Sequence, residues 1–140
     1  MAKSKKRAVS FKFPKSIPVS HRAEVLVCGA GPGGLGAAVS AARAGRDTLL
    51  VERYGFPGGM ATAGEVNPFM SNHLNGVSMD IGVYTEWLDR MKRYGGIANE
   101  LRTIDPFAAR LAAEDMLVDR GVGLLYPPQV ASASVPCRLI

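Results

Sequence analysis

The sequence predicts an α/β fold built on a parallel sheet, and three observations support this. Two short apolar segments, 24–28 and 48–52, flank an alanine-rich segment with helical spacing. A glycine-rich turn follows the first apolar segment directly. A third apolar segment, 122–126, comes after two further helical stretches. Strands that alternate with helices are typical of parallel sheets, because each helix carries the chain back to the start of the next strand.

The first two predicted strands and the helix between them form one compact unit. Segment 24–28 is apolar and β-branched, which suits a strand that is buried on both faces. The helix is predicted over 31–44 and ends at Gly45, a residue that commonly stops helices. The strand at 48–52 completes a βαβ unit within about 30 residues.

The middle of the chain is predicted to hold a long loop and an amphipathic helix. Residues 53–78 are rich in glycine and proline and show no period. Over 80–94, apolar residues recur at three- and four-residue steps: Ile81, Tyr84, Trp87, Leu88 and Met91. We therefore expect a helix with Trp87 in the core.

A further helix and strand are predicted toward the end of the chain. The helix begins at Asp105, a capping residue followed by proline at the first helical position, and runs to Gly121. The strand follows at 122–126. Residues 131–140 show neither helical nor strand period and are predicted to form an irregular tail.

Length and composition limit the classes of protein that fit. The 140 residues suffice for one domain or part of one. No window holds the roughly 18 consecutive apolar residues of a membrane span. The N-terminus is basic, but no apolar stretch of secretory length follows it. We therefore expect a cytoplasmic protein with no membrane partner.

The net charge of +5 comes from the first 22 residues. They contain seven lysines and arginines and no acidic residue, so the rest of the chain carries a charge of −2. Such a segment binds nucleic acid in some proteins. A solvated, disordered leader over 1–22 is the commoner outcome, and we predict no nucleic-acid partner. Loss of nucleic-acid binding on removal of 1–22 would favour the alternative.

The turn at 29–34 matches the pattern G-x-G-x-x-G. Alone the match is weak, and a purely structural glycine turn is the alternative. The context makes it more specific, because a strand precedes the turn, a helix follows it, and Glu52 ends the second strand 23 residues after Gly29. Gly29 allows the tight turn, Gly31 lets the backbone approach a pyrophosphate, and Gly34 lets the helix pack against the sheet.

The same unit explains how an adenine dinucleotide is recognised. The helix N-terminus presents free N–H groups and a partial positive charge to the phosphates. Glu52 can accept hydrogen bonds from ribose hydroxyls and repels the extra phosphate of NADP. About 70 residues separate Glu52 from the third strand, far more than the crossover of a simple NAD domain needs. Additional structure is therefore expected there.

Three stretches together resemble a known family. They are V-L-V-C-G-A-G-P-G-G-L-G-A-A, L-L-V-E-R and G-F-P-G-G-M-A-T-A-G. They are similar to FAD-dependent oxidoreductases with a glutathione-reductase-like FAD domain, and segment 104–126 resembles the helix and strand next to the adenine in that group. Within it, the likeness is greatest to bacterial flavoproteins grouped with heterodisulfide reductase. The resemblance covers about 23–130 and implies FAD as cofactor, with an unknown small-molecule substrate or electron-transfer partner.

The resemblance also assigns residues to FAD. Five would lie at the pyrophosphate: Gly29, Gly31, Pro32, Gly33 and Gly34. Two would hold the adenosine ribose: Glu52 and Arg53. Three would follow the ribityl chain and flavin: Gly58, Gly59 and Met60. Val130 would contact the adenine through its backbone.

No catalytic residue and no metal site are predicted. His21 lies in the leader and His73 in the glycine-rich stretch, and neither has an evident acid–base partner. Some relatives bind iron–sulfur clusters through groups of cysteines. This chain has only Cys28 and Cys137, which we expect to be unpaired thiols in a reducing compartment.

The predicted domain organisation is a leader at 1–22, the N-terminal part of an FAD-binding domain at 23–130 and the tail at 131–140. No second βαβ half or substrate domain follows, so the FAD-binding domain is predicted to be incomplete and the chain inactive by itself. A catalytically inert nucleotide-binding fragment is the alternative to an oxidoreductase portion.

Overall fold

The computed structural model describes residues 16, 18–70, 73–98, 103–128, 130, 132 and 133. Its centre is a parallel sheet of β1 (Val25–Cys28), β2 (Thr48–Val51) and β7 (Gly123–Leu125), in the order β1-β2-β7. The predicted α/β class with a Rossmann-like parallel sheet is confirmed. The leader and tail predictions fall mostly outside the described residues.

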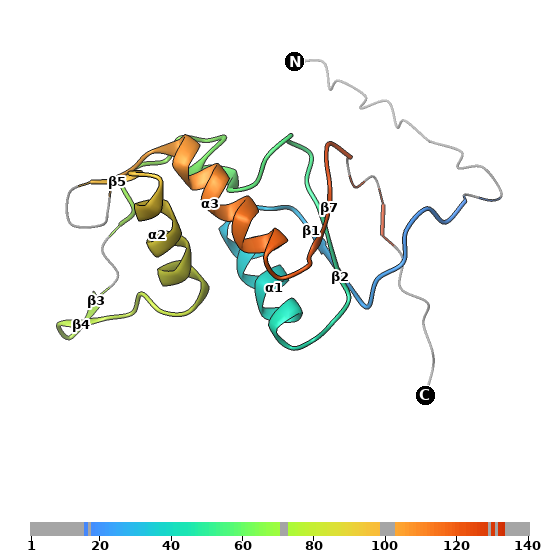
Figure 1. Ribbon diagram of the computed structural model, residues 1–140, viewed down its shortest axis with the longest axis horizontal. Helices are drawn as coiled ribbons and strands as arrows, with labels where there is room; N and C mark the ends of the chain where they lie inside the picture. Colours follow the sequence, from blue (N-terminus) through green and yellow to red (C-terminus); the bar gives the residue numbers. More distant parts are fainter. Residues whose placement is uncertain are drawn as a thin grey trace, which may run out of the picture.

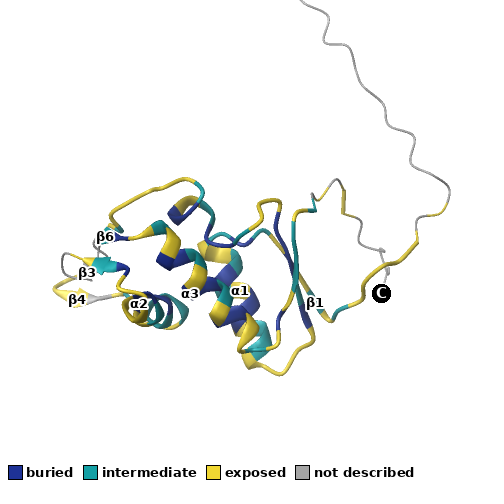
Figure 2. Cartoon of the chain, turned by 45° about the horizontal axis from the view of Figure 1, so that its top comes forward, coloured by how far each residue is buried: buried dark blue, intermediate teal, exposed yellow. Residues whose placement is uncertain are grey.

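Three helices all lie on the same side of this sheet (Figures 1 and 2). They are α1 (Pro32–Arg43), α2 (Val83–Arg93) and α3 (Pro106–Val118). The core lies between them and the sheet, and its largest buried side chains include Leu35, Val39, Leu50, Trp87, Met91, Met116 and Leu117. Helix α1 packs on β1 and β2, and α2 packs chiefly on α3.

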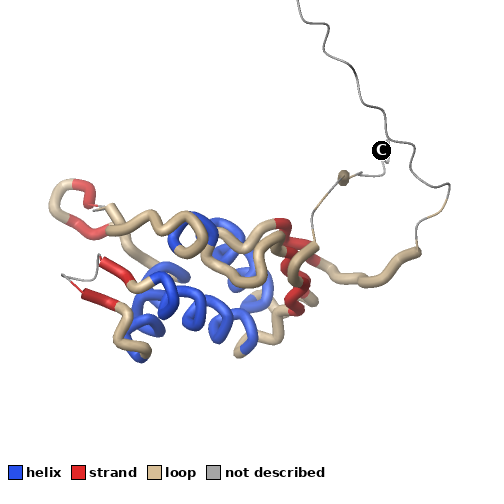
Figure 3. The backbone as a smooth tube through the Cα atoms, turned by 90° about the horizontal axis from the view of Figure 1, so that it is seen from above, coloured by secondary structure: helices blue, strands red, loops and turns tan. Residues whose placement is uncertain are grey.

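The opposite face of the sheet is uncovered by helices in the described parts of the chain (Figure 3). Leu26 of β1 is 58% exposed, and Cys28 is exposed as a free thiol. The prediction that this strand is buried on both faces is therefore wrong for the described residues. The physical reason is that all three helices gather on the face to which Val27 and Leu50 point.

Helix α3 begins as the sequence predicts. The carboxylate of Asp105 accepts hydrogen bonds from the backbone N–H groups of Phe107, at 2.6 Å, and Ala108, at 3.2 Å. Pro106 occupies the first helical position, where a missing N–H costs nothing. Helix α3 ends at Val118, three residues before the predicted end at Gly121.

Helix α2 begins later than predicted. The period of apolar residues placed its start at 80, but Gly82 has a φ of +68° and interrupts the helix before Val83. Ile81 therefore lies outside the helix and is 74% exposed, whereas Trp87 is buried as predicted. The Trp87 indole Nε1 donates to the carbonyl oxygen of Ala109 at 2.9 Å, which joins α2 to α3.

An ion-pair cluster also ties the helices together. The Glu86 carboxylate on α2 accepts hydrogen bonds from Arg43 on α1, from Arg90 at 3.2 Å and from Arg120, just beyond α3, at 2.6 Å. Arg90 also pairs with Asp119 at 2.6 Å. Burial alone raises the pKa of Glu86, but the hydrogen bonds and charges of the arginines outweigh it and lower that pKa below its ordinary value of 4.5.

Short elements fill the segments between the helices. The 3-10 helix η1 (Gly59–Ala61) and a hairpin of β3 (His73–Leu74) and β4 (Val77–Ser78) lie within the stretch predicted as loop. A second pair, β5 (Ile97–Ala98) and β6 (Thr103–Ile104), precedes α3. None of the helices in the described ranges has both the length and the apolar character to cross a membrane.

Candidate functional site

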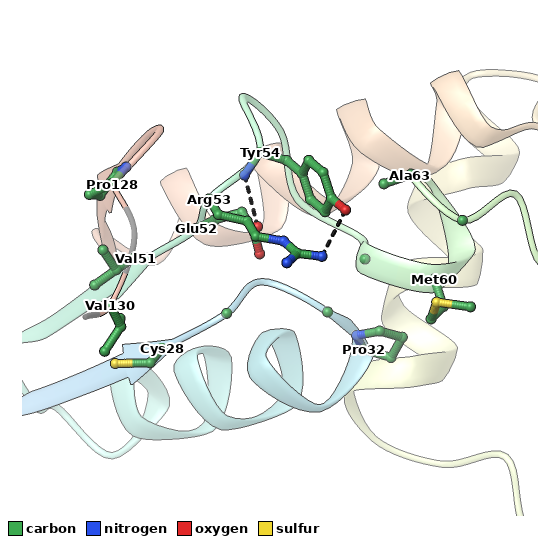
Figure 4. Close-up of a pocket in the computed structure, with 14 residues that line it drawn as sticks. Cys28, Pro32, Val51, Glu52, Arg53, Tyr54, Met60, Ala63, Pro128 and Val130 are labelled. Carbon is green, nitrogen blue, oxygen red and sulfur yellow. Dashed lines mark hydrogen bonds between the residues drawn. The ribbon is translucent and has the colours of Figure 1, made fainter. Parts of the chain in front are cut away.

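A pocket of about 690 Å³ lies at the carboxyl ends of β1 and β2. This edge is where open parallel sheets bind their ligands. Figure 4 shows Met60 and Ala63 on one side of the pocket, Pro128 and Val130 on the other, and Glu52 and Arg53 between them. The lining combines three segments: the turn after β1, the chain after β2 and the chain after β7.

The turn after β1, residues 29–34, is shaped by its glycines and is called the glycine turn below. Gly29 has a φ of +101°, and its N–H donates to the Val51 carbonyl oxygen at 2.7 Å. Gly31 caps α1 without a side-chain hydrogen bond, so the first N–H groups of the helix have no acceptor from the cap. A Cβ on Gly31 would approach only the Cα of Gly59, at 4.0 Å, which leaves the space above the turn open.

Gly34 has a different role in the same turn. A Cβ there would lie 1.8 Å from the Gly29 carbonyl oxygen and 3.6 Å from a methyl group of Val27. Only glycine lets α1 approach β1 this closely, as the sequence predicts. Gly34 therefore supports the turn from below, while Gly31 faces the pocket.

Glu52 braces the glycine turn. Its side chain is buried, and Oε2 accepts a hydrogen bond from the Ala30 N–H at 2.6 Å while Oε1 accepts one from the Tyr54 N–H at 2.9 Å. The backbone N–H of Glu52 donates to the carbonyl oxygen of Leu125, the last paired residue of β7, at 3.1 Å. A carboxylate has about four lone-pair sites. Among the described residues, only the Ala30 and Tyr54 N–H groups occupy these sites, so two are left to accept further hydrogen bonds.

Arg53 is held along the rim by aromatic residues. Its Nη2 donates to the Tyr54 hydroxyl at 2.8 Å, and its guanidinium lies 4.7 Å from the centre of the Tyr54 ring. The Tyr54 ring in turn stacks on Phe56 at 6.0 Å between ring centres. The Arg53 cation thus lies at the pocket with a fixed neighbour (Figure 4).

Residues 59–64 form the side of the pocket that faces the glycine turn, and we call them the far wall. Four of them line the pocket: Gly59, Met60, Ala63 and Gly64. The preceding residue, Gly58, has a φ of +110°, and its N–H donates to the Ala30 carbonyl oxygen at 2.7 Å. A Cβ on Gly59 would lie 2.7 Å from the Gly31 Cα, so the two glycine segments touch backbone to backbone.

Tyr126 lies just beyond β7, and its buried hydroxyl has no hydrogen-bond partner within the described part of the chain. Burial raises the pKa of Tyr126 to about 12, and the negative charges of Glu114 and Glu52 add to this shift. The hydroxyl is therefore protonated across the physiological range. It adds no negative charge near Glu52.

Most of the residues that the sequence assigned to the site lie together in this pocket. Eight of the eleven line it: Gly29, Gly31, Pro32, Glu52, Arg53, Gly59, Met60 and Val130. The other three shape the two glycine segments without lining the pocket: Gly33, Gly34 and Gly58. Six more residues line the pocket and were not predicted: Cys28, Val51, Tyr54, Ala63, Gly64 and Pro128.

Neither histidine is among the described residues that line the pocket. His21 is exposed, and its Nδ1 lies 3.0 Å from the Ser20 hydroxyl. His73 belongs to β3, and its side chain lies outside the described part of the structure, as does Cys137. No group of three potential metal ligands occurs among the described residues.

The sequence from 24 to 137 matches a model of the FAD dependent oxidoreductase family. This chain belongs to that family. FAD is the cofactor of this family, and the resemblance that the three sequence stretches indicate is confirmed at the level of the family. The narrower likeness to flavoproteins grouped with heterodisulfide reductase stays a prediction.

Two individual proteins are also similar. Menaquinone reductase from Mycolicibacterium smegmatis is 40% identical over 79 residues, which is 56% of this chain and 18% of that protein. The crystal structure of THI4 from Thermovibrio ammonificans is 20% identical with a TM-score of 0.47, covering 74% of this chain and 38% of THI4. The chain thus spans less than a fifth of the menaquinone reductase and about two fifths of THI4.

Proposed function

We propose that the pocket binds the adenosine diphosphate part of FAD, with the pyrophosphate over the glycine turn. The observation that carries this proposal is the open space above Gly31, which a side chain would fill, at the start of α1. Backbone N–H groups and the partial positive charge of a helix N-terminus favour a phosphate at such a position. The residues present therefore fit the cofactor.

The proposed position of the pyrophosphate orients the rest of the cofactor. The ribose lies at Glu52, whose two free lone-pair sites accept its hydroxyl groups, and at Arg53. The adenine lies toward Val130, after β7, and the ribityl chain and flavin extend along Gly58, Gly59 and Met60. Pro128 and Val130 lie on the opposite side of the pocket from Met60, as this orientation of the cofactor requires (Figure 4).

The whole protein is proposed to be an oxidoreductase acting on an unidentified small molecule or electron-transfer partner. When bound, the flavin ring supplies the capacity to accept and donate a hydride. The described residues of this chain bind and orient FAD, and we assign no acid or base among them. A cytoplasmic location is part of the same proposal.

Residues 23–130 are proposed to be the N-terminal part of the FAD-binding domain, and this chain alone is proposed to bind FAD without turnover. The support is the uncovered sheet face, where Leu26 is largely exposed. A catalytic flavin site needs walls that exclude water. The alternative is an inert nucleotide-binding fragment. It also binds FAD, and it differs from the first proposal only in that no longer protein uses the bound FAD for catalysis.

Absorption spectroscopy tests the proposed function. The purified chain is mixed with FAD, passed through a desalting column and scanned for the visible flavin bands. We expect the bands to elute with the protein and to bleach with dithionite. Elution of protein without flavin, under conditions where the chain is folded by circular dichroism, would refute the proposal.

A further inference from the structure

Thr62 closes the turn that leads into the far wall. Its side chain is fully buried, and Oγ1 donates to the Pro57 carbonyl oxygen at 2.8 Å. A Cβ on Gly58 would lie 2.2 Å from the Thr62 methyl carbon, so the threonine occupies the space that the glycine leaves. The turn therefore has one closely fitted side chain at its centre.

Arg110 supports the same turn from outside the pocket. It reaches from α3, and its guanidinium lies 3.7 Å from the centre of the Phe56 ring and 5.0 Å from that of Phe107. Its Nη2 lies 3.5 Å from the Thr62 carbonyl oxygen, at the long limit of a hydrogen bond. Among the described residues, Arg110 forms no ion pair. The two aromatic rings and the Thr62 carbonyl oxygen are therefore the contacts that fix the position of its guanidinium.

The Pro57–Thr62 turn contacts the glycine turn through its backbone. Gly58 donates to the Ala30 carbonyl oxygen, and Gly59 lies so near the glycine turn that a Cβ on it would clash with the Gly31 Cα. A shift of the Pro57–Thr62 turn therefore changes the gap between the two walls of the pocket. Neither Thr62 nor Arg110 lines that pocket.

We propose that Thr62 and Arg110 are positioning residues that hold the far wall against the glycine turn and thereby set the affinity for FAD. The proposal rests on the proposed function of the pocket. Thr62 acts through Pro57 and Gly58, and Arg110 acts through the Thr62 carbonyl and the Phe56 ring. Neither side chain contacts FAD. Both act through the backbone of the far wall, which lies against the cofactor.

The test compares Thr62→Val with Thr62→Ser in the full chain, using FAD titrations followed by flavin fluorescence well below the melting temperature. Valine keeps the volume but leaves the Pro57 carbonyl oxygen unpaired, so we expect FAD binding about fivefold weaker or more. Serine keeps the hydroxyl, so we expect it to bind within about twofold of wild type. Equal affinities for valine, serine and wild type would overturn the role of Thr62.

Thr85→Val is the matched control. Thr85 on α2 makes the same kind of bond, from its hydroxyl to the Gly82 carbonyl oxygen at 2.9 Å, and does not line the pocket. We expect Thr85→Val to lower the melting temperature while leaving the dissociation constant of FAD unchanged. If Thr85→Val weakened FAD as much as Thr62→Val does, the effect would be general destabilisation and the proposal would fail.

Arg110→Met keeps the test decisive if Thr62→Val does not fold. Methionine retains apolar packing on Phe56 but loses the charge and the donor to Thr62, so FAD binding about threefold weaker is expected. Exposed Arg93 on α2 gives the control, Arg93→Met, which should not change it. Unchanged affinity of Arg110→Met would exclude Arg110 from the proposal. Failure of wild type to bind FAD would instead reject the proposed function, and this inference with it.

Discussion

Gly31 and Gly34 belong to one motif but differ in what surrounds them. A Cβ at Gly31 meets only the Gly59 Cα, at 4.0 Å, whereas a Cβ at Gly34 meets the Gly29 carbonyl oxygen at 1.8 Å. Gly31 also has an extended backbone that other residues adopt without strain. We therefore expect the first position to matter for binding and the second for folding.

Gly31→Val should abolish FAD binding and leave most of the secondary structure intact. The branched side chain fits the backbone conformation but occupies the space that we assign to the pyrophosphate. FAD titration and circular dichroism of the same sample measure the two effects. Gly34→Ala is the contrasting variant, expected to unfold the chain. Wild-type FAD affinity in a folded Gly31→Val protein would contradict the proposed position.

Glu52→Gln should lower both cofactor affinity and stability. An amide NH₂ would face the Ala30 or Tyr54 N–H, so one of the two hydrogen bonds that brace the turn is lost. We expect FAD binding weaker by about 1.5–3 kcal/mol and a lower unfolding free energy. Calorimetric titration and urea unfolding measure these quantities.

The control for this variant is Glu24→Gln. The Glu24 carboxylate also accepts a backbone N–H, from Asp47 at 2.9 Å, but at the amino end of β1, away from the pocket. It should leave FAD affinity unchanged. If Glu52→Gln altered stability alone, Glu52 would be a brace for the turn without a part in ribose binding.

At the residue scale, the sequence alone identified the residues whose type and spacing indicate one specific role. The spacing of Gly29, Gly31 and Gly34 between a strand and a helix is specific, and so is Glu52 at the end of the next strand. Thr62 and Arg110 escaped notice because a threonine or an arginine fits many environments. Their roles depend on α3 meeting the turn at Pro57, a contact between segments 48 residues apart.

At the element scale, Glu86 is the point at which the three helices meet. It accepts hydrogen bonds from arginines of α1, of α2 and of the chain after α3. Its carboxylate is partly buried, with 20% of the side chain exposed. This ionised group thus adds to the apolar core and to the Trp87 hydrogen bond in joining the helices.

Acid should weaken this junction. Because the pKa of Glu86 is lower in the folded state than its ordinary 4.5, its contribution to the unfolding free energy is fully present above pH 4.5 and is lost as pH falls through the lowered value. Glu86→Gln should be less stable than wild type at neutral pH by about 1–3 kcal/mol, and the two should converge in acid. Urea unfolding at a series of pH values measures both. Exposed Glu65→Gln is the control, and parallel curves for Glu86→Gln and wild type would contradict the assignment.

Element boundaries were predictable where a residue with a defined backbone role marks them. Asp105 and Pro106 fixed the start of α3, and Gly45 lies just beyond the end of α1. The start of α2 was misplaced because the apolar spacing includes Ile81. The backbone of Gly82 is not helical, so the helix begins only at Val83. The two antiparallel strand pairs were missed because their strands have two residues each, too short for any period to show.

At the scale of the whole molecule, the pocket depends on chain segments that are distant in sequence. The glycine turn follows β1, the far wall follows β2, and Val130 follows β7, which pairs with β2 only after about 70 intervening residues. The parallel sheet brings all three to one edge, and the helices on a single face hold it there (Figure 1). The βαβ pattern predicted this edge. The course of the intervening chain depends on tertiary contacts that no local pattern records.

The measurement that tests the central claim most directly is a competition titration of the purified chain with FAD and ADP. If the pocket binds FAD through its adenosine diphosphate part, FAD should bind with a stoichiometry of about one, and ADP should displace it completely at high concentration, since both ligands occupy the same site. NADP should compete more weakly than NAD, because Glu52 repels the extra phosphate. Binding of FAD that ADP does not displace, or no binding of either ligand to folded protein, would contradict the account.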